Sequence, residues 1–246
     1  MASEAQNSPF IKNLASSDKK VRDTALSSLR AYLSAQTTIP PLDLLKLWKG
    51  LFYCLWMQDK PAIQQRLSRD LASLVLDLQD GVALPFVEAF WVTMAREWSG
   101  IEALRMDKFL YLVRQYVNVS FRVVARGEWG DGEKVERCVG IFEETPLSAG
   151  DVKVPNGIRY HVLDVYVDEL EKVAGDAWEK MPVEKMLEPL SKIAKESPTK
   201  SVRELAKESL QDERVRRWKG EEAKGEEAKG EEGEDGEEEE WGGFDD

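Results

Sequence analysis

The hydrophobic positions of this chain recur with a helical period along almost its whole length. Apolar residues return every three or four positions, and alternating strand patterns with hairpin turns are absent. Ser17-Asp18 supplies a cap for one helix, Pro40-Pro41 opens the next, and Asp80-Gly81 closes a later one. The pattern predicts an all-α fold, with helices over about residues 8–15, 18–35, 41–58, 60–79, 82–98, 101–127, 132–145, 157–174, 183–196 and 199–218.

The third and fifth predicted helices carry apolar stripes that are rich in aromatic residues. At 100° per residue, Trp48, Phe52 and Trp56 share an arc of about 140° with three leucines. Trp91 and Trp98 belong to a similar stripe. Such rings can stack on nucleotide bases, but packing is their commoner use. We therefore predict that these five aromatic residues belong to the structural core.

One short segment occurs twice, far apart in the chain. Val21-Arg22-Asp23-Thr24-Ala25 returns as Val202-Arg203-Glu204-Leu205-Ala206. This V-R-x-x-A pattern resembles the second helix of HEAT-type repeats, which stack helix pairs into a solenoid. We predict a single HEAT-like, α-solenoid-like domain of stacked antiparallel helix pairs over residues 8–218, after a flexible N-terminus at residues 1–7.

Charge is distributed unevenly along the chain. Of the formal net charge of −12, residues 219–246 carry −11, from 14 acidic and 3 basic side chains, which leaves −1 for residues 1–218. Lys-Gly-Glu-Glu repeats in this acidic tail predict disorder, since such a composition buries too little apolar surface to fold. Its simplest role is solubility. The alternatives are a shield against basic partners and a short docking motif around Trp241 and Phe244.

Composition argues against several classes of protein. Two cysteines, Cys54 and Cys138, do not suggest a disulfide framework and fit a reducing compartment. No secretory signal, membrane-spanning run or glycine-rich phosphate loop is evident. The one cluster that resembles a metal site is His161, Asp164 and Asp168 on one helix face, and a solvated acidic face explains it better. We expect a soluble intracellular protein that is not an enzyme, with no catalytic residue, metal or cofactor.

Basic residues form two groups that are candidates for contacts with RNA phosphates. Arg105, Lys108, Arg122 and Arg126 fall within about 100° of one another on the long helix at 101–127, opposite its apolar face. An ordinary solvated face is the alternative. The second group consists of Lys195, Lys200, Arg203, Lys207, Arg214, Arg216, Arg217 and Lys219. Its last part, residues 214–219, also resembles a weak nuclear-import signal.

Three segments resemble a known family. Residues 47–61 (LWKGLFYCLWMQDKP), residues 90–114 with Arg96-Glu97-Trp98-Ser99-Gly100-Ile101, and residues 155–170 beginning Pro-Asn-Gly-Ile-Arg-Tyr-His are similar to blocks of the eukaryotic nucleolar ribosomal RNA-processing protein 1 family. The resemblance extends from about Ser8 to Leu210, and the first two blocks are long and aromatic-rich.

The resemblance implies a nuclear, nucleolar assembly factor of the large (60S) ribosomal subunit, required for processing of precursor rRNA. It implies the preribosomal particle as partner, with a Brix-domain protein and a β-propeller protein among the neighbouring factors. Neither a membrane nor a small-molecule substrate is implied. Larger members carry a basic C-terminal extension, whereas this chain ends in acidic sequence, so contacts made by that extension cannot be transferred.

The candidate contact residues combine the basic stripe with the turn at Gln58-Asp59-Lys60-Pro61. We predict partner or RNA contacts by Lys49, Asp59, Lys60, Arg105, Lys108, Arg122, Arg126 and Arg159. The favoured function is a non-enzymatic scaffold. A metal-dependent nuclease acting on precursor rRNA, and a protein-only adaptor that never touches RNA, are the alternatives.

Overall fold

The computed structural model describes residues 9–16 and 18–221, and this part of the chain consists of helices joined by turns and loops, without a strand. The helices are α2 (Pro9–Leu14), α3 (Lys19–Ser34), α4 (Pro41–Trp56), α5 (Pro61–Leu74), α6 (Asp80–Glu97), α7 (Ala103–Ala125), α8 (Gly132–Glu144), α9 (Asn156–Ala174), α10 (Val183–Met186), α11 (Glu188–Glu196), α12 (Lys200–Leu210) and α13 (Glu213–Trp218), with short 3-10 turns at Val75–Asp77, Trp98–Gly100 and Gly175–Lys180. The all-α prediction is confirmed.

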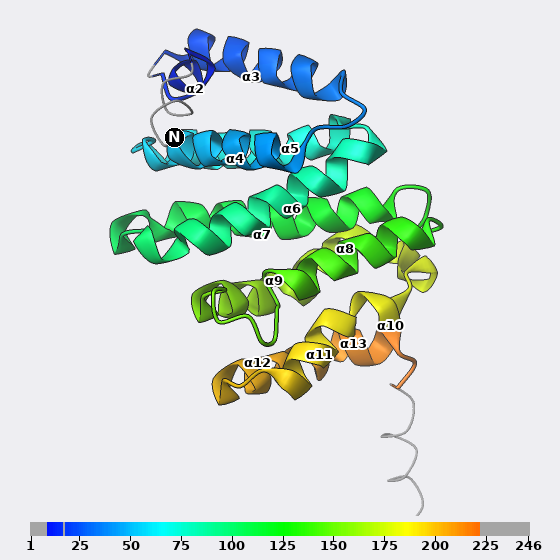
Figure 1. Cartoon of the computed structure of the whole chain (residues 1–246). Helices are drawn as coiled ribbons and strands as arrows, with labels where there is room; N and C mark the ends of the chain where they lie inside the picture. Colours follow the sequence, from blue (N-terminus) through cyan, green and yellow to red (C-terminus); the bar gives the residue numbers. More distant parts are fainter. Residues whose placement is uncertain (1–8, 17, 222–246) are drawn as a thin grey trace, which may run out of the picture.

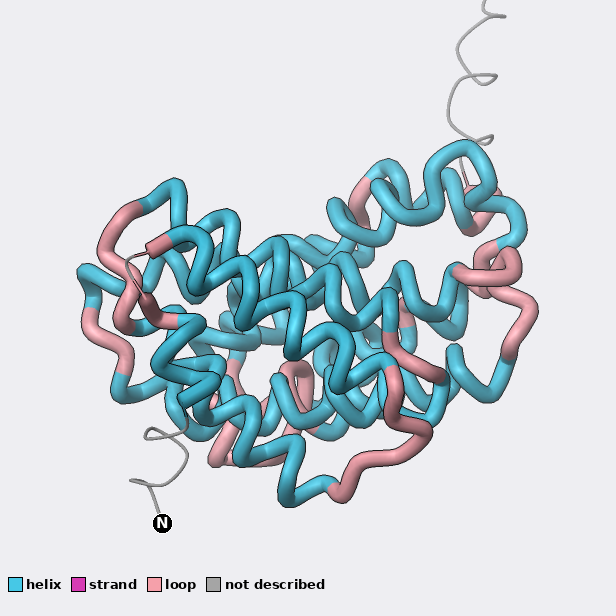
Figure 2. Tube along the Cα trace, turned by 90° about the horizontal axis from the view of Figure 1, so that it is seen from above, coloured by secondary structure: helices cyan, strands magenta, loops and turns pink. Residues whose placement is uncertain are grey.

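Consecutive helices form antiparallel pairs that stack in layers from α2 and α3 at one end to α11, α12 and α13 at the other (Figure 1). One row of the stack contains α4, α6, α8 and α11, and a second row contains α5, α7, α9 and α12. Figure 2 shows the same helices from above. The predicted stack of antiparallel helix pairs is therefore confirmed.

This arrangement gives the stack two edges of turns. The loop edge, on the left in Figure 1, holds the turns at 57–60, 98–102, 145–155 and 197–199, which lead from the first row to the second. The opposite edge holds the turns at 78–79, 126–131 and 175–182. The start of α9 approaches the turn at 98–102 closely, because a Cβ on Gly157 would lie 2.7 Å from Trp98 Nε1.

A continuous apolar core runs through the layers from Leu14 to Trp218. At its centre the Trp48 ring lies 5.0–5.1 Å from Phe86, Phe90 and Tyr116, and its indole Nε1 donates to Phe86 O at 2.9 Å. Such tilted and edge-on aromatic contacts add to the stabilisation from burial. Trp48, Phe52, Trp91 and Trp98 are buried, whereas Trp56 is only half-buried.

The repeated V-R-x-x-A segments fall on α3 and α12, the second helices of the first and last pairs. Arg22 Nη1 donates to Ser16 O at 2.7 Å, and Arg203 Nη1 donates to Ser197 O at 2.7 Å. In both places an arginine binds a backbone carbonyl six residues earlier and fixes the turn that precedes its helix. The repeated sequence therefore makes the same local contact in both places.

Two predicted helices are interrupted in the structure. The helix expected at 199–218 ends at Leu210, because Asp212 begins α13 by accepting from Arg214 N at 2.9 Å. The helix expected at 183–196 divides into α10 and α11 at Leu187. The predicted flexible N-terminus and nearly all of the predicted acidic tail lie outside the described residues. Within those residues, no helix is long and apolar enough to cross a membrane.

Candidate functional site

Lys108 does not belong to an exposed basic stripe. Its side chain is 6% exposed, and its ammonium donates to Trp56 O at 2.7 Å and to Gln58 O at 2.8 Å. Burial lowers its pKa, and nearby Arg105 acts in the same direction. The ammonium therefore satisfies carbonyls at the end of α4 and attaches α7 to the following turn, and the structure corrects its prediction as a contact residue.

The other candidates near this turn remain accessible. Asp59 and Lys60 are exposed, and Lys49 is half-buried on α4. Arg105 pairs with Glu102, and its guanidinium lies over the half-buried Trp56 ring, 5.0 Å from the centroid. Asp59, Lys60 and Arg105 form the polar part of the loop edge around the turn at 57–60, whereas Lys49 lies in the middle of α4.

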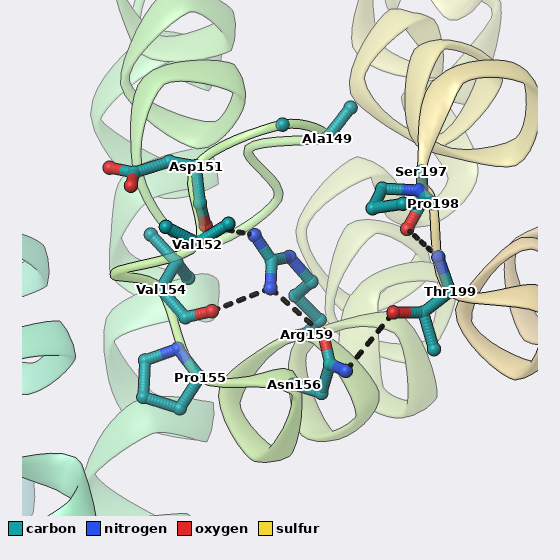
Figure 3. Close-up of a pocket in the computed structure, with 11 residues that line it drawn as sticks. Ala149, Asp151, Val152, Val154, Pro155, Asn156, Arg159, Ser197, Pro198 and Thr199 are labelled. Atoms are coloured by element: carbon teal, nitrogen blue, oxygen red, sulfur yellow. Dashed lines mark hydrogen bonds between the residues drawn. The ribbon is translucent and has the colours of Figure 1, made fainter.

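Arg159 is also buried, which corrects its prediction as a contact residue. It is 5% exposed, and Figure 3 shows its guanidinium inside the loop at 145–155. Its Nε and Nη2 donate to Ser148 O at 2.9 and 2.7 Å, and Nη2 also donates to Asp151 O at 2.7 Å. Nη1 donates to Val154 O at 2.5 Å and to Asn156 Oδ1 at 2.9 Å. The side chain thus holds the loop on the start of α9.

This loop and the turn at 197–199 enclose a pocket of about 250 Å³, the loop-edge pocket. Its walls come from residues 149–152 and 154–156 on one side and from Ser197, Pro198 and Thr199 on the other, with Arg159 between them (Figure 3). Asn156 Nδ2 donates to Thr199 Oγ1 at 3.2 Å and joins the two walls. No pattern in the sequence predicts this pocket, since it depends on two turns that are 40 residues apart meeting at one edge.

The part of the predicted basic stripe that remains exposed lies at the C-terminal end of α7. Arg122 and Arg126 are exposed and line an open hollow of about 490 Å³ with Lys172 of α9. We call this the basic hollow; its remaining lining residues are Asn118, Ala125 and Val173. Arg126 also donates to Leu76 O, and Lys172 pairs with Glu169 at 2.7 Å. The pattern of a single helix does not predict Lys172, because this residue reaches the hollow from the neighbouring helix.

Two other arginines near α9, Arg114 and Arg214, form ion pairs between layers of the stack. Arg114 binds Glu169 at 2.6 Å and Asp168 at 3.1 Å, and Glu169 is almost fully buried. Arg214 binds Asp168 and Glu171 at 3.0 Å each. The hydrogen bonds that Arg214 donates to Asp212, and also to Glu171 and Asp168, raise its pKa, so it stays charged.

The second basic group of the sequence is therefore only partly available. Besides Arg214, ion pairs form between Arg217 and Glu171, between Lys219 and Glu184, and between Lys200 and Glu204. Arg203 is occupied by carbonyls. The exposed members for which no ion pair is found among the described residues are Lys195, Lys207 and Arg216.

The residues considered as a metal cluster have other partners. His161 is half-buried with Nε2 2.8 Å from Leu110 O, and burial lowers its pKa. Asp168 is held by two arginines, and Asp164 is exposed. Across residues 9–16 and 18–221, no group of three or more histidine, cysteine, aspartate or glutamate side chains is arranged to hold a metal ion.

Comparison with known proteins gives one family. The model of the nucleolar protein family Nop52 matches residues 5–243. The chain is 39% identical over 191 residues to human ribosomal RNA processing protein 1 homolog B, covering 75% of this chain and 25% of that protein. It is 36% identical over 203 residues to the human homolog A, covering 79% and 44%, and 32% identical over 195 residues to the Dictyostelium discoideum homolog, covering 72% and 39%. The chain thus spans less than half of the length of these relatives.

Proposed function

Because the chain belongs to the Nop52 family of nucleolar proteins, we propose that it acts in ribosome biogenesis as a non-catalytic scaffold on precursors of the large ribosomal subunit. The names of its relatives refer to ribosomal RNA processing. Stacked helix pairs favour this role, since such stacks present long surfaces to other macromolecules. On this proposal, processing depends on the chain because the particle must be assembled correctly before its RNA is processed.

The basic hollow is the observation that carries the RNA part of the proposal. Arg122 and Arg126 have no ion-pair partner among the described residues, whereas Lys172, beside them on the adjacent helix, pairs with Glu169. Cations left over after internal pairing are the ones that can release counterions from an RNA backbone. We propose that the hollow binds phosphates of precursor rRNA and that the accessible turn at Asp59 and Lys60 binds a neighbouring assembly factor, with Brix-domain and β-propeller proteins as the first candidates.

Crosslinking of the tagged full chain in cells tests the RNA contact. The variant Arg122→Glu/Arg126→Glu is compared with the wild type, and Lys195→Glu/Lys207→Glu serves as a matched control because it reverses two exposed cations elsewhere. We expect crosslinks to precursor rRNA to fall in the first variant and to persist in the second. With purified protein and single-stranded RNA, the slope of log affinity against log salt should decrease in magnitude by about 1.4, since two phosphate contacts are lost.

The crosslinking experiment and a cleavage assay together distinguish the alternative functions. Recovery of precursor-particle proteins without reproducible RNA crosslinks in the wild type would indicate a protein-only adaptor and would refute the RNA contact. Cleavage of spacer RNA by purified chain in the presence of magnesium would refute the non-catalytic role. Loss of crosslinks in both charge-reversal variants would show that the effect is general electrostatics and does not involve the hollow.

A further inference from the structure

Arg69 of α5 and Tyr111 of α7 contact each other across two neighbouring helices of the second row. Arg69 Nη1 donates to the Tyr111 hydroxyl at 3.2 Å, and this is the one hydrogen bond of either side chain within the described residues. Asp70, the residue after Arg69, pairs with Arg66 at 3.8 Å. Arg69 is exposed, and a guanidinium carries five N–H groups, so most of its donors remain available to a ligand.

This pair lies in line with the basic hollow. At 100° per residue, Tyr111, Gln115 and Arg122 fall within about 40° of one another on α7. The step from Tyr111 to Arg122 covers about 16 Å along the helix. Gln115 lies between them and is half-buried, and its side-chain amide has no partner in the described part of the chain. We call the line formed by Arg69, Tyr111, Gln115 and Arg122 the α7 track.

The charge along the α7 track favours a polyanion. Arg69, Arg122 and the adjacent Arg126 pair with no carboxylate among residues 9–16 and 18–221. Asp107 is the one acidic residue of α7, and it is exposed without an ion pair. Three unpaired cations therefore outnumber one unpaired anion, and the net positive charge attracts phosphates.

The middle of α9, on the other side of α7, has the opposite charge. Asp164 is exposed and forms no ion pair with any described residue. Arg114 of α7 is held by Glu169 at 2.6 Å and by Asp168 at 3.1 Å, so its charge is already neutralised. A phosphate backbone is therefore attracted along the α7 track and repelled from the middle of α9.

We propose that the α7 track binds single-stranded RNA. A base stacks on the accessible part of the Tyr111 ring, and the Gln115 amide bonds the edge of a base. Arg69 and Arg122 bind phosphates at the two ends of the track. An A-form duplex keeps its bases stacked inside the helix, so it cannot use the ring. The inference rests on the proposed RNA contact of the basic hollow and adds which form of RNA the chain binds.

Ultraviolet crosslinking of the purified full chain to single-stranded oligouridine, followed by mass spectrometry, tests the stack directly. Trypsin releases residues 109–114, in which Phe109 is fully buried and Tyr111 is the accessible ring. We expect a uridine adduct on Tyr111. Adducts on other peptides, with none on this one, would overturn the proposal without the need for a variant that folds.

Binding of the same oligouridine by variants separates stacking from charge. Tyr111→Ala removes the ring but no charge, so affinity should fall at least about fivefold while the slope of log affinity against log salt stays the same. Tyr111→Phe keeps the ring and should bind like the wild type. Tyr160→Ala is the matched control, because this half-buried tyrosine of α9 bonds Ser201 instead of an arginine, and its affinity should not change.

The outcomes distinguish this inference from the proposed function. If Tyr111→Ala binds like the wild type while Arg122→Glu/Arg126→Glu binds weakly, the stack is refuted and the RNA contact of the hollow stands. If both variants bind like the wild type, both proposals are refuted. The wild type should also prefer the single strand to a duplex of equal length, and Tyr111→Ala should lose this preference; a wild type that prefers the duplex would overturn the inference.

Discussion

Replacing Lys108 with methionine tests whether this lysine is structural. Methionine keeps an unbranched side chain of similar length but removes the ammonium that binds Trp56 O and Gln58 O. The two carbonyls then lose their donors in a place where the side chain is 6% exposed and water has little access.

The expected magnitude follows from these two bonds. A hydrogen bond to a charged group contributes about 1.5–3 kcal/mol, and a buried polar group left without a partner costs about 1–3 kcal/mol. Removing a poorly solvated ammonium recovers part of this, as the lowered pKa of Lys108 indicates. We expect the free energy of unfolding to fall by about 2–3 kcal/mol, and the melting temperature to fall by about 5–10 °C for a chain of this size.

Urea unfolding followed by far-ultraviolet circular dichroism measures this change, with an unaltered m-value as the check that the same surface is exposed. Lys60→Met is the matched control, because Lys60 is exposed in the same turn and should change stability by less than about 0.5 kcal/mol. If Lys108→Met were as stable as the control but failed to associate with preribosomal particles, the structural role would be refuted and a direct contact by Lys108 would be restored.

Three further predictions concern glycine packing, histidine titration and cysteine reactivity. Gly157→Ala should lower the free energy of unfolding by about 1–3 kcal/mol, since the new Cβ would lie 2.7 Å from an indole nitrogen. Gly140→Ala should raise it by about 0.5–1 kcal/mol, because the nearest atom is 3.9 Å away and the position is inside a helix. Equal melting temperatures for the two variants would contradict this packing. The pKa of His161 is lowered in the folded chain, so the unfolded chain binds the proton first as the pH falls. The wild type should therefore lose stability below about pH 6.5, and His161→Gln should lose less. Parallel curves of unfolding free energy against pH for the two proteins would contradict this. Burial raises the pKa of Cys54 and of Cys138 to about 12, so a disulfide reagent should label these thiols only as fast as the chain opens, and immediate labelling of the native protein would contradict their burial.

The periodicity of the sequence was sufficient to predict the helices and most of the core. Trp48, Phe52 and Trp91 lie on stripes whose period matches one helix face, and each is buried in the structure. Helix ends inside a continuous pattern were harder to predict. The interruption at Asp212 depends on its side chain capping α13, which competes with a helical pattern that would otherwise continue through it.

Predicting the candidate contacts from one helix at a time had a different limit. A helical wheel places Lys108 beside Arg105, and both belong to the same arc of α7. The end of α4, however, lies against this part of α7 and takes up the Lys108 ammonium. Arg159 is likewise surrounded by a loop that folds back from α8. The sequence of a single helix contains no information about which neighbour covers it, so burial of these two cations could not be predicted.

The same reasoning explains why few cations remain for binding in a body that is nearly neutral. Arg114 and Arg214 join layers of the stack through carboxylates, and Arg114 faces Glu169, which is almost buried. Removing such an arginine leaves a poorly solvated carboxylate unpaired and weakens the stack itself. Arg122 and Arg126 lack carboxylate partners among the described residues, so their charge can be reversed without breaking an ion pair between layers. Variants at Arg122 and Arg126 can therefore separate an effect on binding from an effect on folding, and the RNA contact should be tested with them.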